Sequence, residues 1–200
     1  MNPGSDFREA LKKKVRSAWW RGYGRTIRNP GIPSGAGSIL YVCKGNIVRS
    51  PFAELLSNRL IAEGGEPPVP LKFSSAGLVT PDVKASPEEA VRAAARFDVS
   101  LREHRPSLVN YSLVESRDLI VAMDVWQMEL LNRMFPEYAG KMVLLPLYDR
   151  ERDRYDDCYW KYNIVDPYGK SVEHYLECYS RMSVVLKDFI AAVRTSRQSR

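Results

Sequence analysis

The chain has 200 residues and a net charge of +6; 44% of its residues are hydrophobic and 27% are charged, a composition typical of a globular protein. No apolar run approaches the ~20 residues of a transmembrane helix, and the N-terminus lacks the apolar stretch of a secretory signal. Three cysteines, an odd number, do not predict a disulfide framework, and no Cys/His cluster has zinc-ligand spacing, so we expect a cytoplasmic protein with free thiols.

The basic charge lies in residues 1–37, which hold eight basic and two acidic side chains, while the remaining residues are neutral as a group. Residues 5–21 are predicted to form a helix, because apolar side chains recur at helical spacing. These side chains are Phe7, Leu11, Val15, Ala18 and Trp19. Such a helix packs on the domain through this stripe, acts as a mobile leader, or docks on an anionic membrane surface through Trp19 and Trp20. Nucleic acid is not expected as a partner, because the rest of the chain adds no basic patch.

Residues 22–37 are rich in glycine and proline and are predicted to be a linker. From residue 38 onward, apolar runs alternate with helical patterns, which is typical of a parallel α/β sheet with right-handed crossovers. The predicted strands cover residues 38–42, 71–77, 118–123 and 141–146. The predicted helices cover residues 51–62, 86–97, 124–135 and 171–194. The sequence thus predicts a basic extension with a linker (1–37), a single domain (38–194) and a C-terminal tail (195–200).

The segment after the first predicted strand has the features of a phosphate-binding loop. Cys43 stands at its entrance, Arg49 at its end, and the residues between them are Lys44, Gly45, Asn46, Ile47 and Val48. Backbone N–H groups and the start of the next helix favour a dianion there, and the arginine fork matches two phosphate oxygens. Both the helix start and Arg49 favour a cysteine thiolate, and Ser50 can donate a hydrogen bond to its sulfur. The cysteine therefore indicates a nucleophile.

This loop implies phosphoryl transfer in two steps through a cysteinyl-phosphate. The departing oxygen needs a proton, which a carboxylic acid from elsewhere in the chain must supply. The candidate is Asp166, at the end of a long polar segment. Pro167 restricts the backbone beside it, and Tyr168 is a candidate wall of the cleft.

Together, these segments resemble the signature of the low-molecular-weight protein tyrosine phosphatases. The matching segments, in the order of the family, are Val42 to Pro51, Ala53-Glu54, Ser75-Ala76-Gly77, His104-Arg105, Ala122-Met123-Asp124 and Asp166-Pro167-Tyr168. The resemblance implies a four-stranded parallel sheet with helices on both faces, and neither metal nor cofactor. It also implies that Cys43 is the nucleophile, Arg49 the phosphate clamp and Asp166 the general acid. The network that holds the loop open would consist of Asn46, Ser50, Ser75 and His104.

Three positions depart from the family pattern. Many members have a second cysteine where this chain has Val48, so a neighbouring disulfide partner for the nucleophile is absent. Lys44 occupies a position at the rim of the cleft that is often apolar in the family. No aromatic residue follows Gly77 until Phe97. Aromatic contact with the substrate is therefore expected from Tyr159, Trp160, Tyr162 and Tyr168.

The leading hypothesis is hydrolysis of protein phosphotyrosine. Phosphoarginine phosphatases of the same fold tend to have threonine at the position of Ile47. Arsenate reductases of this fold need two further cysteines close together, whereas Cys158 and Cys178 lie 20 positions apart. A phosphate-binding docking module with weak catalysis is disfavoured by the complete set of Cys43, Arg49, Ser50 and Asp166. Bacterial members of the family suggest a membrane-bound tyrosine autokinase as a partner.

Overall fold

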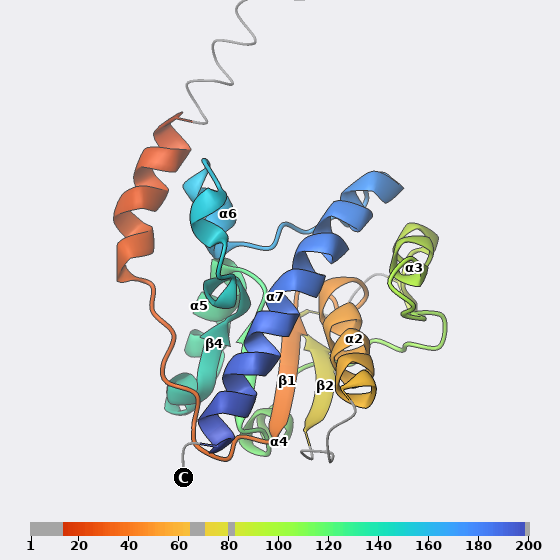
Figure 1. Ribbon diagram of the computed structural model, residues 1–200, viewed down its shortest axis with the longest axis horizontal. Coiled ribbons are helices and arrows are strands. Elements are labelled where there is room, and N and C mark those ends of the chain that lie inside the picture. The colour runs from red at the N-terminus through yellow and green to blue at the C-terminus, as the bar shows by residue number, and fades with distance from the viewer. Residues whose placement is uncertain (1–13, 65–70, 80–82, 199–200) are drawn as a thin grey trace, which may run out of the picture.

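The computed structural model of the protein describes residues 14–64, 71–79 and 83–198. A parallel sheet of four strands has the order β2-β1-β3-β4. The strands are β1 (Ser38–Cys43), β2 (Lys72–Gly77), β3 (Leu119–Ala122) and β4 (Met142–Leu144). Helices cover both faces of the sheet (Figure 1), which confirms the predicted fold class.

Alternate residues of β1 enter two separate cores, because successive side chains of a strand point to opposite faces. Ile39 and Tyr41 pack beneath helices on one face, and Leu40 and Val42 beneath helices on the other. The first face is covered by α2 (Arg49–Glu63) and α7 (Val172–Gln198), with α3 (Glu88–Ala95) packed against α7, and the second by α4 (Tyr111–Glu115) and α5 (Val125–Met134). Burial on both faces explains why the strands are continuous apolar runs in the sequence.

The main differences from the predicted elements are short helices. The sequence analysis did not identify α4, α6 (Cys158–Tyr162), or the 3₁₀ helices η2 (Pro136–Lys141), η3 (Leu145–Tyr148) and η4 (Arg152–Arg154). Each is too short to show a helical period. The predicted strand at 141–146 ends at Leu144, and η3 takes the following residues, including Pro146.

The last helix continues to Gln198, beyond its predicted end at residue 194. The hydroxyl groups of Thr195 and Ser196 donate to the carbonyls of Ala191 and Val193, at 3.0 and 2.8 Å. These local hydrogen bonds accompany the extension of the helix, although its last residues have little apolar surface to bury.

The N-terminal segment lies against the domain. Residues 14–23 are helical and η1 (Gly24–Thr26) follows, while the remainder of the predicted helix, residues 5–13, lies outside the described residues. Val15 and Trp19 are 62% and 57% exposed, so the part of the predicted apolar stripe that the structure describes is not the packing face. Trp20 packs instead: it is 8% exposed, and its ring centroid lies 5.4 and 5.9 Å from those of Tyr159 and Tyr162. Of the three alternatives, packing on the domain is observed, but it occurs through Trp20, the residue after Trp19, because its aromatic partners Tyr159 and Tyr162 lie on α6.

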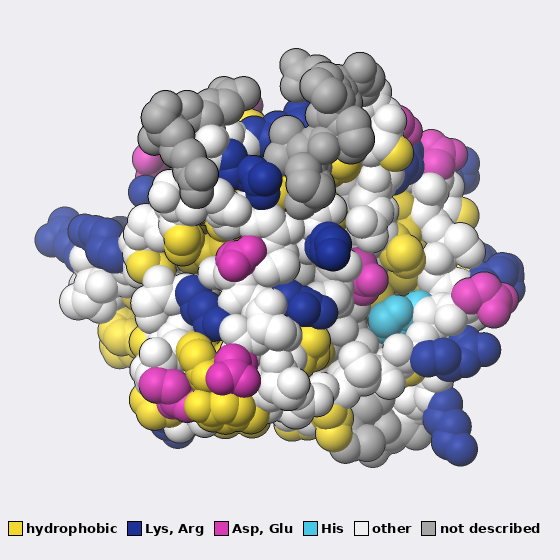
Figure 2. Space-filling model, turned by 90° about the horizontal axis from the view of Figure 1, so that it is seen from below, with side chains coloured by type: hydrophobic (Ala, Val, Ile, Leu, Met, Phe, Trp, Pro, Cys, Tyr) yellow, Lys and Arg dark blue, Asp and Glu magenta, His cyan; other side chains and the backbone are white. Residues whose placement is uncertain are grey.

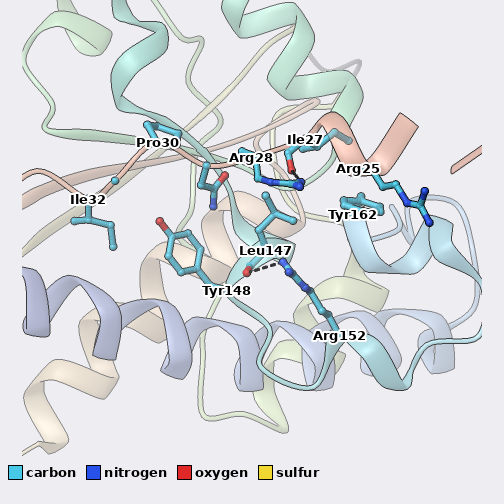
Figure 3. Close-up of a pocket in the computed structure, with 11 residues that line it drawn as sticks. Arg25, Ile27, Arg28, Pro30, Ile32, Leu147, Tyr148, Arg152 and Tyr162 are labelled. Carbon is cyan, nitrogen blue, oxygen red and sulfur yellow. Dashed lines mark hydrogen bonds between the residues drawn. The ribbon is translucent and has the colours of Figure 1, made fainter. Parts of the chain in front are cut away.

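The predicted linker is also attached to the domain. The side-chain amide of Asn29 donates to Leu144 O at 3.1 Å and accepts from Leu144 N at 2.7 Å. It therefore satisfies backbone groups at the exposed edge of β4. A cavity of about 600 Å³ lies between this segment and η3, with Arg28, Tyr148 and Arg152 in its lining (Figure 3).

Charge is mixed at the end of the molecule where the C-terminus lies. Seen from there, basic and acidic side chains are interspersed (Figure 2). Among the helices that the structure describes, none has the length and hydropathy required to cross a membrane.

Asp118 joins the starts of β1 and β3. Its Oδ2 atom accepts hydrogen bonds from Gly37 N at 2.9 Å, and from Ser38 N and Ser38 Oγ at 2.8 Å each. Burial tends to raise the pKa of this carboxyl group, but the hydrogen bonds outweigh burial and hold the pKa below its ordinary value of 3.8.

We expect Asp118→Ala to lower the free energy of unfolding by about 1 kcal/mol at neutral pH, a figure reduced for the exposure of the carboxylate. Because the pKa is lower in the folded than in the unfolded state, this contribution is present above about pH 4 and is lost as the pH falls through the folded pKa. Urea unfolding at about pH 7 and about pH 3 measures both effects. Asp118→Asn, which keeps an acceptor without a charge, should cost less at neutral pH. Equal losses for Asp118→Ala at both pH values would contradict this account.

Candidate active site

The loop between β1 and α2 closes tightly around the end of β1. Asn46 has a φ angle of 53°, in the left-handed region, which turns the chain within the loop. The neighbouring strand allows the loop to approach because it ends in glycine. A Cβ atom on Gly77 would lie 2.9 Å from the carbonyl carbon of Gly45 and 3.0 Å from Asn46 N. Any side chain at this position would push the loop away from the sheet.

A directed hydrogen bond reaches the sulfur of Cys43. The Oγ atom of Ser50 donates to Cys43 Sγ at 3.0 Å. The side chain of Asn46 sets this direction: its Oδ1 accepts from Ser107 N at 2.9 Å, so its Nδ2 faces Ser50 Oγ and Ser75 Oγ, at 2.9 and 2.8 Å. Because Nδ2 donates to Ser50 Oγ, the hydroxyl of Ser50 keeps its own proton to donate, and Cys43 Sγ at 3.0 Å is a nearer acceptor than Ala76 O at 3.3 Å.

Residues outside the loop also form hydrogen bonds in this network. Ser75 Oγ donates to Glu54 Oε2 at 2.6 Å, and His104 Nε2 donates to Asn46 O at 2.8 Å, since a carbonyl can only accept. Burial lowers the pKa of His104, although its hydrogen bond to Asn46 opposes this effect. The structure thus brings together the four residues expected in the network, Asn46, Ser50, Ser75 and His104.

Glu54 and Ser107 complete the network, and the sequence analysis gave neither a role. The position of Glu54, four residues after Ser50, places both on one side of α2, and this spacing was a usable signal. Ser107 acts through its backbone N–H, which no sequence pattern distinguishes.

Arg49 is 2% exposed and contacts two carboxylates. Its Nη1 donates to Asp124 Oδ2 and to Ile164 O, each at 2.8 Å, and its Nη2 donates to Asp166 Oδ2 at 2.6 Å. Burial by itself lowers the pKa of Arg49, but Asp166 and Asp124 outweigh it and raise the pKa above its ordinary value. The Nε atom of Arg49 is buried without a hydrogen-bond partner in the described part of the chain, so this donor is open to a ligand.

Asp124 is the functional residue that the sequence analysis quoted in a motif without giving it a role. It caps the start of α5 by accepting from Gln127 N at 2.9 Å, and Gln127 Nε2 donates to its Oδ2 at 2.6 Å. Its position directly after β3 was the available signal. The carboxyl ends of parallel strands meet at one edge of the sheet, which places Asp124 near the loop after β1.

A cavity of about 400 Å³ opens beside Arg49. Lys44, Asp124 and Asp166 line it together with Arg49. Its aromatic lining consists of Trp19, Trp20, Tyr23, Trp126 and Tyr159. Of the aromatic residues expected to contact the substrate, Tyr159 lines this cavity. Most of its aromatic lining, however, comes from the N-terminal helix and α5.

The other expected wall residues lie elsewhere. Trp160 and Pro167 line a separate cavity of about 290 Å³, together with Cys178 on α7. Tyr162 stacks on Trp20, and Tyr168 is 48% exposed. The role of Pro167 and Tyr168 as a substrate wall stays a prediction.

The two further cysteines are free thiols, as is Cys43. Cys158 begins α6, and Cys178 lies within α7, where burial raises the pKa of its thiol to about 12. Cys178 therefore stays protonated near neutral pH. In the described residues, no group of three or more His, Cys, Asp or Glu side chains could hold a metal ion.

The chain matches known proteins over nearly the whole of this fold. A family model described as "Low molecular weight phosphotyrosine protein phosphatase" matches residues 38–199. The low molecular weight protein-tyrosine-phosphatase Wzb of Escherichia coli K12 is 32% identical over 160 residues, which cover 80% of this chain and 97% of Wzb. The protein-arginine-phosphatase of Bacillus subtilis is 28% identical over 161 residues, which cover 80% of this chain and 99% of that protein.

A solved structure is similar in the same region. It is a mutant of the YwlE arginine phosphatase with a phosphorylated active-site serine, and it aligns with a TM-score of 0.66 at 27% identity. The alignment covers 82% of this chain and 98% of the YwlE chain. Sequence and structure agree, and the chain belongs to the low molecular weight phosphotyrosine protein phosphatase family and is a phosphatase.

Proposed function

We propose that the protein hydrolyses protein phosphotyrosine through a cysteinyl-phosphate at Cys43. The observation that carries this proposal is the hydrogen bond from Ser50 to the Cys43 sulfur beside a buried guanidinium with an open Nε donor. The name of the Escherichia coli relative supports phosphotyrosine as the substrate class, and the phosphorylated serine in the YwlE mutant supports a covalent intermediate.

In the first step, a phosphate dianion occupies the loop and Arg49 binds its oxygens. The thiolate of Cys43 attacks phosphorus, so an S–P bond forms while the P–O bond to tyrosine breaks. Asp166 gives its proton to the leaving phenolate oxygen. The loop's N–H groups and Arg49 favour the charge that is spread over the phosphoryl oxygens.

In the second step, water attacks the phosphocysteine and the S–P bond breaks. Asp166, now a carboxylate, takes a proton from this water, and phosphate leaves. Ser50 Oγ donates to Cys43 Sγ at 3.0 Å, and this hydrogen bond stabilises the departing thiolate.

Arg49 Nη2 donates to Asp166 Oδ2 at 2.6 Å. A bound dianion competes for the guanidinium and frees the carboxyl group. Substrate binding would thus prepare the acid for catalysis.

The proposed substrate is a phosphotyrosine protein. A membrane-bound tyrosine autokinase as partner and an anionic membrane surface for residues 1–37 stay predictions. Burial of Trp20 against α6 limits the second idea, because only Trp19 of the two tryptophans is exposed for an interface.

Phosphoarginine is the second candidate substrate, because one relative is a protein-arginine-phosphatase. Ile47 argues against it: the side chain is 7% exposed in the loop and offers no hydroxyl group for a polar leaving group. Phosphotyrosine and phosphoarginine differ in the leaving group that is bonded to phosphorus. The side chain at position 47 of the loop is therefore suited to distinguish the two substrates.

We expect Cys43→Ser to abolish turnover of a phosphotyrosine peptide, because a serine hydroxyl is a much weaker nucleophile at neutral pH. Asp166→Asn should lower kcat by about 10²–10⁴-fold, since an amide cannot give up the proton. Steady-state kinetics with the purified full chain measure both changes. Cys158→Ser is the matched control and should retain the wild-type rate. Unchanged turnover in Cys43→Ser would overturn the proposed mechanism.

We expect kcat/KM to be at least about 10²-fold higher for a phosphotyrosine peptide than for a phosphoarginine peptide of the same flanking sequence. Ile47→Thr should reduce this ratio by adding a hydroxyl group to the loop. Phosphate release from both peptides gives the two constants. A wild-type ratio of one or below would make phosphoarginine the better candidate.

We expect hydrogen peroxide to inactivate the enzyme with poor recovery in dithiothreitol. Val48 cannot form a disulfide with oxidised Cys43, and the thiol of Cys178 is buried and protonated, so the sulfenic acid proceeds to irreversible forms. Activity after timed exposure and reduction measures the loss. Val48→Cys should restore recovery. Full recovery of the wild type after long exposure would disprove this expectation.

A further inference from the structure

The N-terminal helix, residues 14–23, is fixed to the domain at several points. Trp20 is buried against α6, and Arg16 Nη2 pairs with Asp157 Oδ2 at 2.6 Å. The Tyr23 hydroxyl donates to Glu129 on α5, and this hydrogen bond raises the pKa of Tyr23. Just after the helix, a Cβ on Gly24 would lie 2.2 Å from the ring of Tyr162, so the chain follows the domain surface closely.

This helix forms one wall of the cavity that Arg49 and Asp166 line. Trp19, Tyr23 and Trp126 line the same cavity of about 400 Å³ as Arg49 and Asp166. The family model begins at residue 38, so this wall lies outside the part of the chain that matches it.

Two tryptophans of this cavity stay exposed. Trp19 is 57% exposed and Trp126 is 46% exposed. Trp19 is held in place by its own helix, because its ring stacks on Tyr23 at 4.7 Å and meets Trp20 edge-on at 5.0 Å. Large aromatic side chains that are ordered yet exposed beside a reaction site are typical of contact surfaces.

The acidic groups around this surface are already engaged, and Lys44 is the remaining charged side chain in the lining. Asp124 and Asp166 pair with Arg49, and Glu129 accepts from Tyr23. Apart from Lys44, the surface that remains for a ligand beyond the phosphate site is aromatic. This aromatic part fits an apolar or aromatic side chain.

We propose that Trp19 and Trp126 form a docking surface for a large apolar side chain that flanks the phosphotyrosine in the protein substrate. The proposal rests on the proposed function, because the surface is continuous with the phosphate site. The N-terminal helix is thus a specificity element of the enzyme. A small ester reaches only the phosphate site, whereas a protein segment contacts both.

The test uses the full chain and three substrates: phenyl phosphate, a phosphotyrosine peptide with flanking leucine or phenylalanine, and the same peptide with serine there. We expect Trp19→Ala to raise KM for the apolar peptide about 10-fold with kcat unchanged, because the contact is the same in the ground and transition states. KM for phenyl phosphate and for the serine peptide should stay at wild-type values.

Val15→Ala is the matched control, since Val15 is an exposed apolar side chain of the same helix and is not part of the cavity lining. It should leave all three KM values unchanged. Trp126→Ala, on the other side of the cavity, should reproduce the KM effect if Trp19→Ala fails to fold. Thermal unfolding of each variant checks folding.

Equal KM values for wild type and Trp19→Ala with the apolar peptide would overturn the docking surface while leaving the phosphatase reaction intact. So would a loss of self-association or of vesicle binding in Trp19→Ala without a change in KM, because the occupant would then be a second copy or a lipid surface. Hydrolysis of phenyl phosphate but of neither peptide would instead overturn the proposed function, and the docking surface with it.

Discussion

The rest of the active site depends on the pairing of one buried guanidinium. Arg49 is almost fully buried, and a buried charge without partners is strongly unfavourable. Its partners come from three places in the chain: the cap of α5, the backbone of Ile164 and the carboxylate of Asp166. Ile164 N in turn donates to Met123 O at 2.9 Å, which attaches the acid-bearing segment to the end of β3. The charge of Arg49 thus connects the loop after Cys43, the N-terminal cap of α5 and the carboxylate of Asp166.

The loop itself is organised by a single amide. Asn46 takes the left-handed conformation, receives hydrogen bonds from Ser107 and His104, and gives hydrogen bonds to two serines. Because a side-chain amide has a donor end and an acceptor end, its orientation makes Ser50 Oγ an acceptor from Nδ2 and leaves the hydroxyl proton of Ser50 available for the sulfur. The loop is therefore shaped for an anion before one binds, which lowers the cost of ordering on binding.

The N-terminal segment shows how composition can mislead about packing. Its basic residues and apolar stripe suggested a helix packed on the domain through that stripe, a mobile leader or a membrane helix, and its glycines and prolines suggested a linker. In the structure, the segment instead lies along α6, α5 and the edge of β4, through Trp20, Tyr23 and Asn29. The stripe was a sound guide to helix formation. It did not identify the packing face, because that depends on the aromatic residues of α6, more than 130 positions away in the sequence.

The sequence by itself determined the four strands, the long helices between them and the loop from Cys43 to Ser50, because these depend on local periodicity and on a motif of contiguous residues; it also singled out Asp166 as a candidate acid. Only the tertiary structure decided which groups meet Arg49, that Glu54 and Ser107 complete the loop network, and that Trp19 and Trp126 share a cavity with Arg49 and Asp166. These contacts join residues far apart in the chain. Their geometry follows from sheet order and helix packing, which no local pattern encodes.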